Sequence, residues 1–312
     1  HREDYYSTMP GFASATAPVP ADSTGKRSTP GFFTQLHVLL MRRWAIFFRD
    51  RTQLLLQIAM LVIFPLVVVL FAYEGIPALK RSSDTLASNP AAELVEQMNI
   101  QKNRMEVGGL LSGLVMFQVV LLALMGSNNS AREIAGERQI FEKEKLGGLR
   151  VTSYLGSKIF FLSVLVGIQS VWMYLFVSLF AQMPTSVLVH GSLLILVNAA
   201  MTAICLGISA SMDSPDQASL LSIYLVGFQL PLSGAVLALP AVLEPFIQPF
   251  ISAYWSWSGI VRSLDPRFFA AVDTVTDATL RPVTLCFAAL GVHLAVGLIL
   301  ALTGAGRSRW SH

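Results

Sequence analysis

The stretch that decides the fold is "IFFLSVLVGIQSVWMYLFVSLFAQMPTSVLVHGSLLILVNAAMTAICLGISASM", residues 159–212, which contains no Asp, Glu, Lys or Arg. A charged side chain at the centre of a bilayer costs roughly 2.5–3.5 kcal/mol, whereas about 20 apolar residues can cross it as a helix. The run is too long for one crossing. The segment "AQMPTSV", residues 181–187, divides it, because Pro184 and its polar neighbours favour a turn. We therefore predict two membrane-spanning helices, at about 157–181 and 187–210.

Four further runs without charge indicate four more crossings. The predicted spans lie at about 52–73, 107–129, 217–239 and 282–304. An apolar content of 54% and a mean hydropathy of +0.59 also exceed what an ordinary soluble domain shows. The sequence thus predicts an all-α, polytopic membrane protein with six transmembrane helices in a domain over residues 51–306.

The region before the first span has two parts. Residues 1–30 are rich in Pro, Ser, Thr and Gly without any apolar period, and we expect a flexible linker. Residues 31–50 are predicted to form an amphipathic connecting helix that lies on the membrane, with one apolar face made by Phe33, Leu36, Leu40, Trp44 and Phe47. Its Arg42 and Arg43 suit the headgroup layer. Because the first residue is His1 and not Met, we expect that the chain was cut from a longer protein.

The distribution of Lys and Arg predicts the orientation. With a cytoplasmic N-terminus, fifteen of these residues face the cytoplasm and seven face outward, as the positive-inside rule requires. The C-terminal tail, 307–312, is then cytoplasmic too. The positive charges are distributed by side of the membrane and do not form one basic patch. Nucleic acid is therefore not an expected partner, whereas membrane lipids are. Cys205 and Cys286 fall inside predicted spans, which favours packing roles over metal binding, and no metal site is predicted.

The outward segment between spans five and six, residues 240–281, is rich in proline and aromatic residues. Pro240, Pro245 and Pro249 argue against a seventh span, and Tyr254, Trp255 and Trp257 are of the kind that gathers at membrane interfaces. We predict a re-entrant segment of short helices that dip into the outer leaflet.

The stretch "SAREIAGERQIFEKEKLGG", residues 130–148, is called the charged segment below, since it gathers eight charged residues in an otherwise apolar chain. Ile134 and Phe141 lie seven apart on one apolar face, and Gly147 and Gly148 favour a helix stop. A short amphipathic helix over 130–147 is predicted, on the cytoplasmic side. Composition alone leaves two interpretations open, a solvated face or a surface that docks on a partner.

The residues "ERQIFEKEKLGGLRVTSYLGSK", 137–158, resemble the coupling-helix region of the transmembrane permease domain of G-subfamily ABC exporters, of the ABC-2 membrane type. The matching positions are Glu137, Arg138, Ile140, Phe141, Lys143, Glu144, Gly148, Leu149, Ser153, Tyr154 and Lys158. Arg150 departs from the pattern, which commonly has Tyr there. Four further features follow each other in the family order: the connecting helix, the charged segment, Leu232–Gly234 and the aromatic outer segment. The absence of outward cysteines and of an outward glycosylation sequon is typical of a bacterial member in the plasma membrane.

The resemblance implies a permease that is not catalytic by itself. The chain has no Gly-rich phosphate loop ending in Lys-Ser or Lys-Thr, so ATP and Mg²⁺ are expected on a nucleotide-binding domain, fused upstream or separate. A second permease copy is expected as partner in a homodimer. The exporter would move a hydrophobic, amphipathic or lipid-like substrate out of the cytoplasm or inner leaflet. The residues expected to couple to the ATPase are Glu133, Glu137, Arg138, Phe141 and Glu144.

By the same resemblance, the substrate cavity lies between spans two and five of both copies. Its expected lining is Met116, Phe117, Val120, Leu124, Tyr224, Phe228, Gln229 and Leu232, with an outer gate at Ala235, Val236 and Leu237. The competing interpretation of these apolar residues is plain helix packing.

A different class of function was also considered. A rhomboid-like intramembrane serine protease would use Ser233 and His293 as its dyad, but Pro231 replaces the glycine that such a site needs. An ion channel or proton-coupled transporter is disfavoured because the predicted spans carry no Asp, Glu, Lys or Arg apart from Lys158 at the start of the third span.

Overall fold

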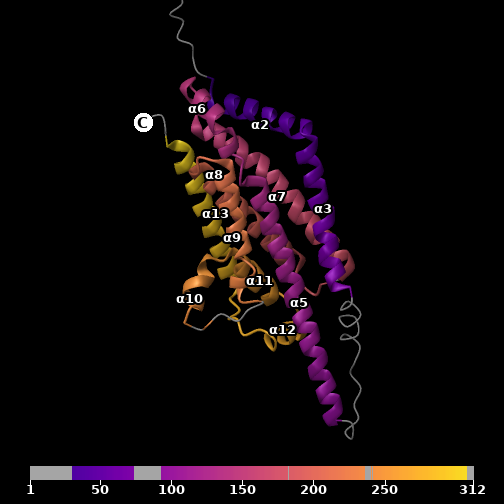
Figure 1. Cartoon of the computed structure of the whole chain (residues 1–312). Helices are drawn as coiled ribbons and strands as arrows, with labels where there is room; N and C mark the ends of the chain where they lie inside the picture. Colours follow the sequence, from indigo (N-terminus) through magenta and orange to yellow (C-terminus); the bar gives the residue numbers. More distant parts are fainter. Residues whose placement is uncertain (1–29, 74–92, 182, 236–239, 241, 308–312) are drawn as a thin grey trace, which may run out of the picture. The chain divides into compact units, whose positions relative to one another are not determined.

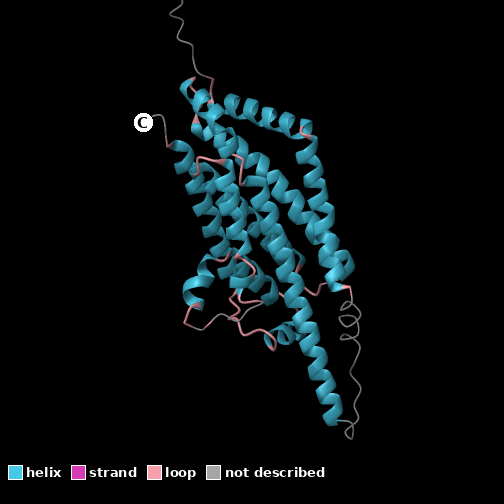
Figure 2. Ribbon diagram, in the orientation of Figure 1, coloured by secondary structure: helices cyan, strands magenta, loops and turns pink. Residues whose placement is uncertain are grey.

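The computed structural model describes residues 30–73, 93–181, 183–235, 240 and 242–307. The described residues form helices and turns, with one isolated bridge between Thr185 and Leu264 (Figure 2). From Phe32 onward the chain forms one compact unit. The prediction of an all-α membrane protein is therefore confirmed. Most of the predicted linker and tail, with Val236 and Leu237 of the predicted gate, lie outside the described residues.

In the described part of the chain, five helical stretches are long and apolar enough to cross a membrane. They contain or coincide with α3 (Arg51–Ala72), α5 (Glu93–Ser130), α7 (Val151–Ala181), α8 (Val187–Ser211) and α13 (Val283–Gly306). Asp50 caps α3 because its side chain accepts hydrogen bonds from the backbone N–H groups of Thr52 and Gln53, both at 3.1 Å. Predicted spans one, two, three, four and six correspond to these helices.

The fifth predicted span, 217–239, is wrong as one continuous helix. The helix α9 (Pro215–Gly227) is short, and a turn leads from it to the 3₁₀ helix η3 (Pro231–Ser233). Pro231 has no backbone N–H for the carbonyl of Gly227, and its ring would collide with that carbonyl in a continued helix. The chain also turns inward here, because Gln229 Oε1 accepts the backbone N–H of Ala253 at 2.9 Å.

The outer segment consists of short helices, as predicted: α10 (Glu244–Ile247), η4 (Gln248–Phe250), α11 (Ser252–Arg262) and α12 (Pro266–Asp273). Two of its aromatic residues are enclosed by protein, so they do not face lipid. Tyr254 and Trp257 have no exposed surface, and Trp257 Nε1 donates to Ser112 Oγ of α5 at 3.2 Å. The helix α11 therefore belongs to the core, while Phe246 and Phe250 remain 72% and 77% exposed.

The helix α2 (Phe32–Arg49) confirms the predicted connecting helix, and its buried face is shifted from the predicted one: Phe47 is buried, and Leu36, Leu40 and Trp44 are half-buried. Gln35, Leu39, Arg43 and Phe47, spaced four apart, are buried, whereas Phe33 is 81% exposed. Figure 1 shows α2 lying across one end of the bundle beside α6 (Arg138–Leu146), with α10, α11 and α12 at the opposite end. The elements that carry most of the charged side chains are thus gathered at one end.

The contact between α8 and α13 depends on glycine. A Cβ on Gly297 would lie 2.5 Å from the carbonyl carbon of Ala203, and one on Gly304 would lie 2.8 Å from that of Ala210. Real Cβ atoms do not approach backbone so closely, so the two helices touch through their main chains. Such small-residue contacts hold membrane helices together, where no hydrophobic driving force acts between them.

We expect Gly297→Ala to destabilise the chain by about 1–3 kcal/mol, because the added methyl group must push α13 away from α8. The measurement is the midpoint of thermal unfolding in detergent. Gly291→Ala is the matched control, since Gly291 lies on the same helix with nothing within 4 Å of its Cβ position. Equal midpoints for the two variants would contradict the close contact.

Candidate functional site

The charged segment is not one helix over 130–147, as predicted, but a turn, the 3₁₀ helix η2 (Ala135–Glu137) and α6. The backbone N–H groups of Ile134 and Ala135 both donate to Ser209 Oγ of α8, at 3.1 and 3.0 Å, which fixes the turn. The predicted glycine stop is confirmed, because Gly148 has a φ of 97°, a conformation that favours glycine.

Four charged side chains form a cluster in which three are buried and the fourth, Glu137, is 27% exposed, and we call it the buried charge cluster. Arg43 of α2 binds Glu133 through two hydrogen bonds, from Nε at 2.6 Å and from a terminal nitrogen at 2.7 Å. Lys158 of α7 donates to the same carboxylate at 3.0 Å and to Glu137 at 2.7 Å. Three elements far apart in the sequence are therefore joined by one set of ion pairs.

The buried charge cluster contains two positive and two negative groups, so its formal charges cancel. The side chains of Arg43, Glu133 and Lys158 are 7%, 6% and 3% exposed. Removing such groups from water is expensive, and the expense is offset only where geometry is good and each charge has its partner. The cluster consequently fixes the position of each member much more strictly than a surface ion pair would.

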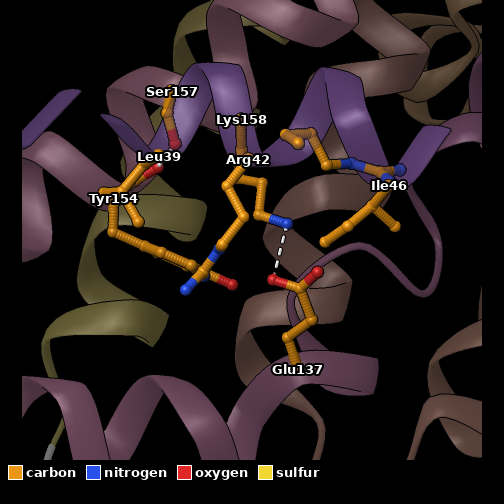
Figure 3. Close-up of a pocket in the computed structure, with 8 residues that line it drawn as sticks. Leu39, Arg42, Ile46, Glu137, Tyr154, Ser157 and Lys158 are labelled. Carbon is orange, nitrogen blue, oxygen red and sulfur yellow. Dashed lines mark hydrogen bonds and ion pairs between the residues drawn. The ribbon is translucent and has the colours of Figure 1, made fainter. Parts of the chain in front are cut away.

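A second ion pair joins α2 to α6. Arg42 donates to Glu144 at 2.5 Å, with both side chains about one third exposed. The hydrogen bond that Arg42 donates to Glu144 raises the pKa of Arg42 above its ordinary value. Figure 3 shows Arg42 beside Tyr154 and Glu137, with the contact of Glu137 and Lys158 drawn as a dashed line.

Uncharged contacts complete the attachment of the charged segment. Phe141 stacks on Tyr154 of α7 with ring centroids 4.1 Å apart. Gln35 of α2 donates to the carbonyl of Gly148 at 3.2 Å and accepts the N–H of Arg150 at 3.0 Å. The side chain of Arg138 donates to the carbonyl of Ala210, at the end of α8. The segment is thus tied to α2, α7 and α8.

All five residues predicted to couple to the ATPase lie at this site, but their side chains make contacts within the chain. The exposed side of α6 consists of other residues: Ile140 is 55% exposed, Leu146 is 80% exposed, and Lys143 is exposed between them. The sequence interpretation missed Gln35, Arg43 and Lys158 as partners. Nothing in the sequence showed which groups these three side chains face.

The residues predicted to line the substrate cavity separate into two groups. Phe117, Val120 and Leu124 are partly open on α5, and Tyr224 and Phe228 of α9 are 61% and 58% exposed. Met116 and Gln229 are buried within this chain, at 1% and 2% exposure, and Leu232 packs against the core. An apolar cavity of about 590 Å³, lined by Phe117, Gly113 and Leu230 among others, opens beside the first group.

Ser233 and His293 form hydrogen bonds with different partners. Ser233 Oγ donates to the carbonyl of Leu230 at 2.7 Å, whereas His293 Nδ1 faces Ser252 Oγ at 2.9 Å. Ser252 has no exposed surface, and Nε2 of His293 donates to the carbonyl of Pro249. This serine and histidine join α11 to α13, and a rhomboid-like protease is not favoured. Among the described residues, no group of three or more His, Cys, Asp or Glu is arranged to hold a metal ion.

Residues 34–258 match the family of ABC-2 type transporters, which is the membrane component of ATP-binding cassette transporters. The match covers more than half of the chain, so the chain belongs to this family and is the permease part of such a transporter. No curated protein matches the chain. The match begins within α2 and ends within α11, and it therefore includes the whole buried charge cluster.

We expect Glu133→Gln to destabilise the protein by about 3–5 kcal/mol, because it leaves Arg43 and Lys158 buried with one carboxylate between them. The midpoint of thermal unfolding in detergent measures the effect. Asp216→Asn is the control, since Asp216 is 81% exposed and lies 3.5 Å from an exposed Arg132. Adding Lys158→Gln to Glu133→Gln should recover part of the loss. If the destabilisation of the double variant equalled the sum of the two single effects, the result would argue against the cluster.

The pair of Arg42 and Glu144 is expected to tolerate exchange. Arg42→Glu or Glu144→Arg alone places like charges together, and each should lower the ATPase activity of the intact transporter in proteoliposomes. The double variant, with the charges exchanged, should restore most of that activity, because the partners still attract. If both single variants kept full activity, the attachment of α2 to α6 would have no role in coupling.

Proposed function

We propose that the chain is the membrane half of an ATP-driven exporter that moves a hydrophobic, amphipathic or lipid-like compound out of the cytoplasm or inner leaflet. Its ATPase partner, fused or separate, docks on the exposed side of α6. Two copies of the permease assemble about a two-fold axis, as is common for symmetric oligomers. The family and the arrangement of the charged segment support this proposal.

The observation that carries the proposal is the division of α6 into two sides. The inner side contributes Phe141 and Glu144 to contacts with α7 and α2, while Ile140 and Leu146 remain exposed beside Lys143. Exposed apolar side chains next to a charge suit an interface in which the apolar groups supply contact area and the charge selects the partner.

The coupling mechanism follows from the ties inside the chain. A displacement of α6 would be transmitted to α7 through the stack of Phe141 on Tyr154 and through the bond of Lys158 to Glu133. It would be transmitted to α2 through the bond of Arg43 to Glu133. Because the buried charges cannot separate cheaply, the charged segment, α2 and the adjoining end of α7 should move as one body. In this proposal the five predicted coupling residues transmit the movement, and Ile140, Lys143 and Leu146 receive it.

The proposed orientation has the N- and C-termini in the cytoplasm. Fifteen Lys and Arg residues fall on that side in this arrangement, against seven outside. Figure 1 places α2, α6 and the last turn of α13 at the same end of the bundle. Lys145 of α6 also donates to the carbonyl of Gly306 at 3.2 Å, so these elements share one side of the membrane.

The exposed apolar residues of α5 and α9 support both the dimer and the class of cargo. Phe117 and Leu124 on α5, with Tyr224 and Phe228 on α9, are open within one chain and would meet a second copy. Membrane helices pair by surface fit, and a space between two such faces would be lined by aromatic and aliphatic groups. An amphipathic or lipid-like cargo fits such a lining.

Cysteine labelling tests the orientation and the docking together. In the full transporter, Leu146→Cys should react with a membrane-impermeant maleimide in inside-out vesicles and should be protected when the ATPase domain is docked. Phe246→Cys, at the opposite end and 72% exposed, is the matched control and should react in right-side-out vesicles. Labelling of Leu146→Cys from outside would overturn the orientation, and labelling unaffected by the ATPase would overturn the docking site.

A further inference from the structure

A second cavity, of about 620 Å³, lies between α3, α5, α9 and the charged segment. It is separate in its lining from the apolar cavity beside Phe117, which is formed by the other half of α5. Its volume falls within the roughly 300–1,000 Å³ that small-molecule sites occupy. Of the residues predicted to line a substrate cavity, Leu124 is the one found in this lining, and the expected coupling role does not explain the rest of the space.

One wall of the cavity is polar and rich in hydrogen-bond donors. Gln53 comes from the first turn of α3, Ser127 and Asn128 come from the last turn of α5, and Ser219 comes from α9. Asn128 is exposed and Gln53 is half-buried, so their amide groups are accessible from the cavity.

Among the charged residues that line the cavity, one cation at its edge is not part of the buried charge cluster. The carboxylates of Glu133 and Glu137 line the cavity, but Arg43 and Lys158 already bind them. Arg132 is different, because its side chain is 64% exposed and its ion pair with Asp216 is long, at 3.5 Å, and solvated. A second contact, from Nε to Ser219 Oγ at 3.1 Å, holds the guanidinium at the edge of the cavity. Such a guanidinium can exchange a weak partner for a phosphate.

A second part of the lining, one helical turn from Gln53, Asn128 and Ser219 on the same three helices, is aliphatic. Leu56 of α3, Leu124 of α5 and Ile223 of α9 line it, and Leu56 and Ile223 are 47% and 55% exposed. These three helices cross or enter the membrane from this end, so the aliphatic wall continues toward the hydrocarbon region. The cavity therefore has a polar, cation-bearing part at the interface and an apolar part that leads into the bilayer.

We propose that this cavity binds a phospholipid, with the phosphate against Arg132, Asn128 and Gln53 and one acyl chain along Leu56, Leu124 and Ile223. A soluble phosphate would use the polar wall alone, and an uncharged lipid would use the aliphatic wall alone. The presence of both walls in one cavity favours a molecule with both parts. Its role as a loading site for cargo rests on the proposed export function, whereas binding itself needs neither ATP nor the ATPase.

Protection of a cysteine from modification tests the binding. In the full chain carrying Asn128→Cys, solubilised in detergent, dioleoyl phosphatidylglycerol at ten times its Kd should slow modification by N-ethylmaleimide about tenfold, because only the empty cavity reacts. Dioleoylglycerol, which has the same tails without phosphate, and inorganic phosphate should each slow it far less. Gln139→Cys, on the exposed side of α6, is the matched control and should react at one rate throughout.

Replacement of the cation tests the phosphate contact. Adding Arg132→Gln to Asn128→Cys should weaken protection by phosphatidylglycerol by roughly tenfold or more, since a charge-assisted contact is lost. Arg132→Lys should keep part of it, and Arg267→Gln, which removes an exposed charge elsewhere, should change nothing. Equal protection by dioleoylglycerol or by inorganic phosphate would overturn the proposal, as would no protection with a normal Gln139→Cys rate. These outcomes are independent of docking by the ATPase.

Discussion

The contact on which the rest of the structure depends is the binding of Glu133 by Arg43 and Lys158. One carboxylate joins the connecting helix, the charged segment and the start of α7, all at positions with less than one tenth of their side-chain surface exposed. A buried ion pair adds little net stability compared with apolar packing, yet it does not tolerate the loss of one partner. Its value here is positional, because each of the four charges has its partner in this arrangement of the three elements.

The rigidity of this end contrasts with the openness of the faces formed by α5 and α9. The helices α8 and α11 form the buried part of the bundle, and α13 touches α8 through glycine and alanine. The helix α5 packs on that part with one side and leaves Phe117 and Leu124 partly open on the other. In the proposed dimer this division would let a fixed body carry force while the open face meets the second copy and the cargo.

The two cavities differ in the chemistry that they offer. The one beside Phe117 is apolar, and the one beside Asn128 has donors, a cation and an aliphatic wall. Residues of α5 line both cavities. A lipid-like molecule would therefore meet an apolar lining at one level of this helix and a polar lining at the other. The buried charge cluster forms part of the wall of the polar cavity, and movement of the charged segment would therefore alter that cavity directly.

The sequence by itself determined the fold class, the places of five long helices, the connecting helix and the glycine stop at Gly148, because these follow from local composition and period. It failed where long-range contacts decide. Pro231 and the inward bond of Gln229 shorten the fifth predicted span, and packing buries Tyr254 and Trp257, whose composition alone favoured the membrane interface. Glu133, Glu137 and Glu144 were found as a charged group, but their partners on α2 and α7 were not. An ion pair needs two groups within a few ångströms, and only the tertiary structure brings residues 43, 133 and 158 that close.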